Sequence, residues 1–233
     1  MARQCGNVYE DGSLAQVTGA TLRPGGFELT EKALAYCSFP AGAKVLDIGC
    51  GTGETVHFLR ERYGLEAQGL DASPVMIQKG LEKYPDLPIR CGSGTALPCP
   101  GASLDGILLE CTFGLIDDKD ALLKEINRAL KEGGKLIITD IYYRNRPGSV
   151  HTREGILGLL AAYGLAVTVW EDHSDYLVQL VVDSIMKHGT ADTLWSCLLN
   201  KKENQGCSCK EIKAWKPGYF LLVAEKKSRG EEC

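Results

Sequence analysis

The sequence predicts an α/β fold in which helices cover both faces of a mostly parallel sheet. Short apolar runs typical of strands alternate with amphipathic runs typical of helices, and a glycine-rich turn follows the first apolar strand. The length of 233 residues suits one large domain. A net charge of −4 without a Lys/Arg run argues against a nucleic-acid partner.

Composition and the start of the chain indicate a reduced, cytoplasmic environment. No apolar run approaches the roughly 20 residues of a membrane span. The first residues, "MARQCGNVYEDG", lack the charged-then-apolar layout of a signal peptide. We therefore expect the 10 cysteines to be mostly reduced thiols, and a disulfide framework is not expected.

The elements follow one another as strand–helix units. Branched apolar residues mark "KVLDI" and "KLIITDIY" as buried strands, and Ser73 with Pro74 marks a helix start. The glycines of "KEGG" are expected to end a helix. Strands are expected at 44–48, 66–71, 88–91, 103–110, 135–142, 165–172 and 218–226, and helices at 53–63, 73–84, 119–130 and 152–164.

One domain with short appendages is the simplest organisation. Residues 1–40 are expected to form an N-terminal extension that contains a helix at "ELTEKALAYC" and caps a domain of residues 41–228. Within that domain we expect a mainly helical insertion at about 174–200 and a cysteine-bearing loop at 200–213. Residues 229–233 form a tail.

The glycine-rich turn "VLDIGCGTGE" predicts a ligand site. Glycines at 49, 51 and 53 allow a ligand to approach the backbone closely. The spacing is G-x-G-x-G, so it is neither the dinucleotide fingerprint G-x-G-x-x-G nor a phosphate-binding loop. Asp71 ends the next strand, where an acidic residue accepts hydrogen bonds from both ribose hydroxyls.

With these motifs the chain resembles the class I S-adenosylmethionine-dependent methyltransferases, in particular the type 11, quinone- and arsenite-methyltransferase-like groups. The resemblance implies a Rossmann-like doubly wound sheet of seven strands, the last antiparallel, with S-adenosyl-L-methionine as cofactor. It implies that Asp71 binds the ribose and that the acidic residue usual at the adenine amino group is replaced by Ser93. The cofactor-binding residues implied are Asp47, Gly49, Cys50, Gly51, Gly53, Asp71, Ala72, Met76, Ser93, Gly94 and Glu110.

The segment "LLECTFGLIDDK" places Glu110 and Cys111 where the family has the residues nearest the transferred methyl group. It is similar to the segment of arsenite methyltransferases in which a cysteine binds trivalent arsenic, and Cys111 falls on that cysteine. The second arsenic-binding cysteine of that family is Ala166 here. Cys197, Cys207 and Cys209 are candidate substitutes as soft-metal or metalloid ligands, and reduced bystander thiols are the alternative. No complete zinc site is indicated.

Two further residues are candidates at the same site. The segment "TLRPGGFELT" is shared with a set of bacterial methyltransferases, which suggests that Arg23 meets the cofactor carboxylate, and a simple turn is the alternative. His173 follows the strand at 165–172 and is a candidate general base, against a surface histidine near a helix cap.

The expected function is methyl transfer to a small molecule, with a soft thiol- or metalloid-type acceptor as one candidate. Cys111, Glu110 and His173 are the candidate catalytic residues. A quinone-type carbon or oxygen methyltransferase is the alternative enzyme. From another class, a thiol-rich sensor or chaperone that binds the cofactor without turnover is also open.

Overall fold

The structure is a computed structural model that describes residues 23–191, 195, 207 and 209–228. A seven-stranded sheet in the order β3-β2-β1-β4-β5-β7-β6 forms its centre. Within the described residues, no helix combines the length and apolar character needed to cross a membrane. The strands are β1 (Lys44–Ile48), β2 (Glu66–Asp71), β3 (Ile89–Cys91), β4 (Leu104–Glu110), β5 (Leu130–Tyr143), β6 (Leu165–Asp172) and β7 (Pro217–Lys226).

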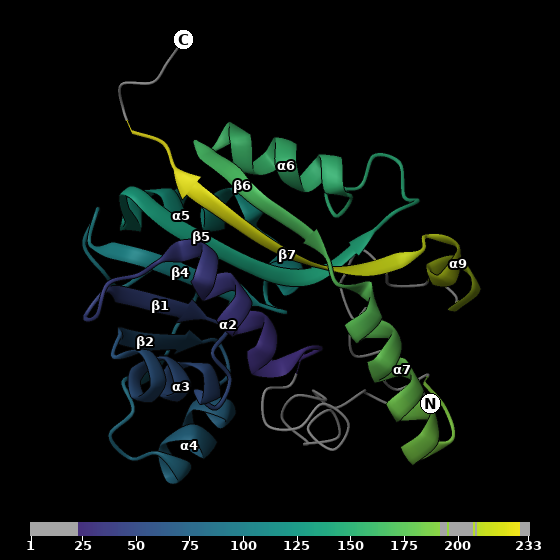
Figure 1. Cartoon of the computed structure of the whole chain (residues 1–233), viewed down its shortest axis with the longest axis horizontal. Helices are drawn as coiled ribbons and strands as arrows, with labels where there is room; N and C mark the ends of the chain where they lie inside the picture. Colours follow the sequence, from purple (N-terminus) through teal and green to yellow (C-terminus); the bar gives the residue numbers. More distant parts are fainter. Residues whose placement is uncertain (1–22, 192–194, 196–206, 208, 229–233) are drawn as a thin grey trace.

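The helices form two layers around this sheet (Figure 1). Apolar side chains of α2, α3, α4 and α7 pack in one core cluster, and those of α5 and α6 pack in the cluster on the other face. Because successive residues of a strand point to opposite faces, the central strands contribute to both clusters. The helices are α2 (Gly26–Cys37), α3 (Glu54–Tyr63), α4 (Pro74–Lys83), α5 (Lys119–Ala129), α6 (Arg153–Ala162), α7 (Ser174–His188) and α9 (Cys209–Ala214), and η1 (Phe113–Leu115) is a 3₁₀ turn.

The topology confirms the predicted fold class. β1 is parallel to β2 and β4, β2 is parallel to β3, and β4 is parallel to β5. β7 is antiparallel to both β5 and β6, between which it lies. This is the mostly parallel, doubly wound sheet with an antiparallel last strand that the resemblance implied.

The helix starts follow their capping residues. The side chain of Ser73 accepts a hydrogen bond from the backbone N–H of Met76 at the start of α4, where Pro74 occupies the first helical position. Asp118 and Thr152 cap α5 and α6 in the same way. These caps fix the helices that follow β2, β4 and β5.

One expectation was wrong at the end of α5. The helix ends at Ala129, before the glycines of "KEGG", because Leu130 is already extended and pairs with Leu104 in the sheet. The register of β4 with β5 then shifts, and Gly133 adopts a φ of 73° inside β5. The glycines therefore form an irregularity in a strand and do not end the helix.

Candidate functional site

A cavity of about 430 Å³ lies where β1, β2 and β4 end, on the carboxyl side of the sheet. Its volume is within the range of small-molecule sites. Ligands bind at this edge of open α/β sheets because the strand-to-helix loops converge there. The predicted residues that line the cavity are Arg23, Asp47, Gly49, Cys50, Gly51, Asp71, Ala72, Met76, Ser93, Gly94, Glu110 and Cys111.

The glycine turn between β1 and α3 forms one wall. Gly49, Gly51 and Gly53 have φ values of 81°, 54° and 83°, a region that favours glycine. A Cβ atom on Gly49 would lie 2.1 Å from Oγ1 of Thr112. The turn thus needs glycine at position 49 for its close approach to the loop after β4.

Asp71 presents its carboxylate at the end of β2. Its Oδ2 accepts a hydrogen bond of 2.8 Å from the backbone N–H of Gly51, and its Oδ1 accepts one of 2.8 Å from that of Ser73. Each oxygen keeps a second lone pair, since a carboxylate oxygen can accept two hydrogen bonds. The carboxylate is therefore oriented by the backbone and can still accept from two hydroxyls.

Glu110 and Arg23 form a buried ion pair beside the glycine turn. Nη2 of Arg23 lies 2.9 Å from Oε2 of Glu110, and the two side chains are 5% and 2% exposed. The hydroxyl of Thr30 donates to Oε1 at 2.8 Å, and that of Thr55 donates to Oε2 at 3.1 Å. Arg23 also donates to both threonines. This network joins the chain at α2 to α3 and β4.

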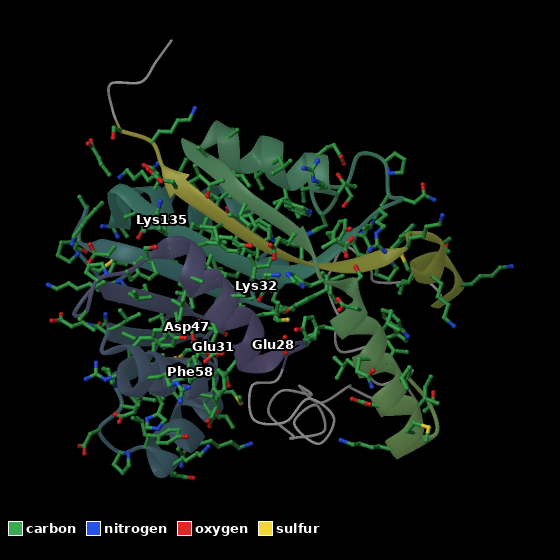
Figure 2. All side chains as sticks on the ribbon, viewed as in Figure 1. Glu28, Glu31, Lys32, Asp47, Phe58 and Lys135 are labelled. Atoms are coloured by element: carbon green, nitrogen blue, oxygen red, sulfur yellow. The ribbon has the colours of Figure 1, made fainter. Side chains whose placement is uncertain are left out.

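Asp47 adds a second buried carboxyl to the same wall. It is 3% exposed and lies at the end of β1, and Figure 2 labels it near α2, the helix that carries Glu28, Glu31 and Lys32. Burial and the nearby carboxylate of Glu110 raise the pKa of Asp47 well above its ordinary value, against the opposing effect of Arg23.

Cys111 follows β4 in an unusual backbone conformation. Its φ is 55°, which a residue with a side chain rarely adopts, and its backbone N–H donates to the carbonyl of Thr139. Its Sγ lies 3.1 Å from the hydroxyl of Tyr219. Burial raises the pKa of the Cys111 thiol to about 12, and the carboxylate of Asp140 adds to the shift. The raised pKa favours the neutral thiol at this end of the cavity.

Several predicted residues do not line the cavity. Gly53 begins α3, where a Cβ atom would lie 2.5 Å from Leu87, so it allows the helix to pack closely. His173 is also absent from the lining, and its Nε2 is hydrogen-bonded to Glu171 at 2.8 Å. Its proposed role as a general base therefore has no support from this geometry.

The cysteine cluster considered from the sequence is only partly within the described residues. Cys207 does not line the cavity. Cys197 and the side chain of Cys209 fall outside what the structure describes. Among the side chains that it does describe, no group of three or more His, Cys, Asp or Glu residues could hold a metal ion.

The loop after β4 also lines the cavity, although none of its residues beyond Cys111 was predicted to do so. Thr112, Leu115 and Ile116 line the cavity, and the first of these contacts the glycine turn. The carboxylate of Asp140 holds this loop, because its Oδ2 accepts a hydrogen bond of 2.6 Å from the backbone N–H of Gly114. The position of the loop at the carboxyl end of a central strand was the available signal.

The polar and apolar groups that line the cavity fit a nucleoside-bearing sulfonium cofactor. Asp71 suits ribose hydroxyls, and Ala72, Met76 and Ile116 provide an apolar lining for a base. Among the described residues, the lining contains four carboxylic acids, Asp47, Glu54, Asp71 and Glu110, and one cationic side chain, Arg23. Glu110 is paired with Arg23 and Glu54 with Lys83, and the raised pKa of Asp47 favours its neutral form, so Asp71 is the main negative charge left to face a ligand.

Comparison with known proteins agrees with this geometry. Residues 46–138 match the family model described as "Methyltransferase domain". Phosphoethanolamine N-methyltransferase 1 of Zea mays is 28% identical over 182 residues, which are 70% of this chain and 36% of that protein. Demethylmenaquinone methyltransferase of Lysinibacillus sphaericus is 31% identical over 120 residues, 49% of this chain and 51% of that one.

Solved structures share the fold. Phosphoethanolamine N-methyltransferase 2 of Haemonchus contortus, in complex with S-adenosyl-L-methionine, has a TM-score of 0.73 at 19% identity and covers 94% of this chain and 57% of that one. The [4+2]-cyclase SpnF has a TM-score of 0.75 at 22% identity and covers 96% of both chains. At these identities the likeness concerns the fold alone.

The matched segment and these relatives support a class I S-adenosylmethionine-dependent methyltransferase. The cofactor of such enzymes is S-adenosyl-L-methionine, which the lining of the cavity fits. The chain spans about a third of the length of this Zea mays protein and of phosphoethanolamine N-methyltransferases 1 and 3 of Arabidopsis thaliana.

Proposed function

We propose that this methyltransferase transfers the methyl group of S-adenosyl-L-methionine to a small acceptor without a phosphate group. The observation that carries the proposal is one cavity that has the Asp71 carboxylate on β2 and the Cys111 thiol after β4 in its lining. The first suits the cofactor ribose, and the second lies beside the place proposed for the acceptor.

The chemistry asks little of the protein beyond placement. S-adenosyl-L-methionine held at Asp71 and the glycine turn would supply an activated methyl group to an electron pair of the acceptor, and its sulfur would leave as a neutral thioether. The residues of the cavity contribute by orienting the two reactants and excluding water, because good alignment alone can contribute about 7–11 kcal/mol to lowering the barrier.

Charge argues for an acceptor without a phosphate group. Arg23 is the only cationic side chain among the described lining residues, and its guanidinium is paired with Glu110. Phosphate recognition normally uses Arg, Lys or a helix N-terminus free to donate. With Glu110 and Glu54 paired with cations, the charge of Asp71 remains, and the described lining offers a phosphate ester such as phosphoethanolamine no cationic side chain beyond the paired Arg23.

Two classes of acceptor fit the proposed function. A soft sulfur or metalloid acceptor is supported by the Cys111 thiol in the lining, but the raised pKa of that thiol disfavours the thiolate that binds metals. A quinol-type carbon or oxygen acceptor is supported by the apolar Leu115 and Ile116 and by the resemblance to demethylmenaquinone methyltransferases.

The first test is cofactor binding. Calorimetric titration of S-adenosyl-L-homocysteine into wild type, Asp71→Asn and Asp86→Asn should show a loss of affinity of about 10- to 100-fold for Asp71→Asn, since hydrogen bonds to a charged group contribute about 1.5–3 kcal/mol. Asp86 is exposed and outside the cavity lining, so Asp86→Asn should bind like wild type. Equal binding by all three proteins would overturn the proposed site.

The second test identifies the acceptor. The reduced protein and its Cys111→Ser variant are incubated anaerobically with S-adenosyl-L-methionine and arsenite, small thiols, quinols or phosphoethanolamine, and release of S-adenosyl-L-homocysteine is followed by mass spectrometry. Turnover of arsenite or thiols that needs Cys111 would favour the soft acceptor, and turnover of quinols without that need would favour the quinol class. Efficient turnover of phosphoethanolamine would overturn the charge argument. Tight cofactor binding without turnover of any acceptor would favour a non-catalytic binding protein.

A further inference from the structure

The part of the cavity next to Asp71 is suited to the base of the cofactor. β2 pairs with β3 so that Asp71 lies beside Cys91, and the segment Gly92–Gly94 follows directly. With the ribose at Asp71, the base would lie between this segment and the apolar residues Met76 and Ile116, which line the same cavity. The polar groups of Gly92–Gly94 are then placed to contact the edge of the base.

Ser93 is held in place by its two glycine neighbours. A Cβ atom on Gly92 would lie 2.4 Å from Cδ1 of Leu70, and one on Gly94 would lie 2.8 Å from Cγ2 of Ile48. The backbone on either side of Ser93 therefore packs directly against the side chains at the ends of β1 and β2. Within the segment Gly92–Gly94, Ser93 is the residue that has a side chain.

The hydroxyl of Ser93 can either donate or accept. Its Oγ lies 2.7 Å from Oγ1 of Thr95, with either atom as donor, and it accepts a hydrogen bond of 3.2 Å from the backbone N–H of Thr95. If Thr95 is the donor, the Ser93 hydrogen is free for a ligand acceptor. If Ser93 is the donor, its remaining lone pair is free for a ligand donor.

A carboxylate at this position would behave differently. It only accepts hydrogen bonds, so it would favour a purine with an amino group at position 6 and disfavour one with a carbonyl oxygen there. The carboxylic acids among the described lining residues, Asp47, Glu54, Asp71 and Glu110, lie on other segments of the chain. The Ser93 hydroxyl is therefore the side-chain group placed to contact the edge of the base, and it can bond to a purine with either an amino group or a carbonyl oxygen at position 6.

We propose that Ser93 relaxes the selection at purine position 6, so that the chain also binds the 6-oxo, inosine form of its thioether product. This inference rests on the proposed function, since it places the cofactor in the same cavity. The chemical class of the additional ligand is a 6-oxopurine nucleoside thioether.

The test compares two ligands across three proteins. Dissociation constants of S-adenosyl-L-homocysteine and S-inosyl-L-homocysteine are measured by calorimetry for wild type, Ser93→Asn and Ser93→Asp. Asn and Asp have nearly the same shape, but Asn carries a donor and an acceptor whereas Asp only accepts. For each protein, the ratio of the two dissociation constants is taken, and the ratios are compared among the proteins. Contacts to the rest of the base differ between the ligands but not between the proteins, so they cancel in this comparison.

We expect similar ratios for wild type and Ser93→Asn, and a preference for the adenosyl ligand at least tenfold greater for Ser93→Asp. Equal ratios for Ser93→Asn and Ser93→Asp would overturn the assignment to Ser93, as would a wild-type preference as strong as that of Ser93→Asp. These outcomes leave the proposed function intact. Failure of wild type to bind either thioether would instead overturn the proposed function, and this inference with it.

Discussion

The buried pair of Arg23 and Glu110 makes a strong prediction about stability. Replacing Arg23 with Met removes the guanidinium but keeps most of the side-chain volume. Glu110 would then remain 2% exposed, with only the hydroxyls of Thr30 and Thr55 as side-chain donors in the described network. An uncompensated carboxylate would be left in the interior.

The expected loss is large because both members are buried. Breaking a buried pair by removing one partner costs about 3–5 kcal/mol, mainly from the charge that is left alone. For a chain of this size, each kcal/mol lowers Tm by about 2–4 °C, which gives a decrease of about 6–20 °C for Arg23→Met. Removing both charges in Arg23→Met with Glu110→Leu should restore most of the stability, since no isolated charge remains.

Urea denaturation and thermal unfolding of the ligand-free protein measure these differences. Lys124→Met is the matched control, because the pair of Lys124 and Asp120 is 66% and 59% exposed and should contribute less than about 1 kcal/mol. A loss below about 1 kcal/mol for Arg23→Met would refute the reasoning. So would a double variant whose loss equals the sum of the single losses, because the two charges would then be independent.

Three further predictions concern the turn and the thiol. Gly49→Ala should lose more stability than Gly64→Ala in urea denaturation, and should lose S-adenosyl-L-homocysteine binding. Both glycines have positive φ, which costs an alanine about 1–2 kcal/mol, but only at Gly49 does the new Cβ meet a neighbour, so equal losses would contradict the predicted clash. Iodoacetamide at pH 8 should label the exposed Cys91 well before the half-buried Cys111, because the thiolate is the reactive form and the pKa of Cys111 is raised. Equal rates in peptide mass spectrometry would argue against the raised pKa. The free energy of unfolding should fall as pH rises from about 9 to about 12. The pKa of Cys111 is raised from 9.0 to about 12 in the folded chain, so the unfolded chain loses this proton at lower pH and is favoured as the pH rises. Cys111→Ala should make that decline shallower, and an unchanged slope in denaturation at several pH values would count against the raised pKa.

The sequence was sufficient for the parts of the site that depend on local order. The turn from Gly49 to Gly53 and the strand-terminal Asp71 are signals within short segments, and the parallel order of β1 and β2 brings them together. The strand–helix alternation likewise predicted the sheet and both helix layers. These features follow from periodicity and turn chemistry alone.

Other parts depend on contacts between distant segments. Thr30 and Glu110 are 80 residues apart in the chain, and no local pattern indicates that Glu110 is committed to Arg23 and two threonines. Nothing in the sequence indicates the positive φ of Cys111 either, because glycine and asparagine are the residues that usually adopt this backbone conformation. The glycines of "KEGG" predicted the end of a helix, but the pairing of Leu130 with Leu104 places them inside a strand.

The position of β7 has a consequence for biosynthesis. Among the described strands, β6 pairs with β7 alone, and β7 occupies one of the two edges of β5. A nascent chain that has emerged only through β6 therefore carries an unpaired edge on β5 and a strand with no partner. Until residues 217–226 leave the ribosome, this half of the molecule exposes strand edges that can pair with other chains, so protection by a chaperone or the ribosome surface would matter most in that interval.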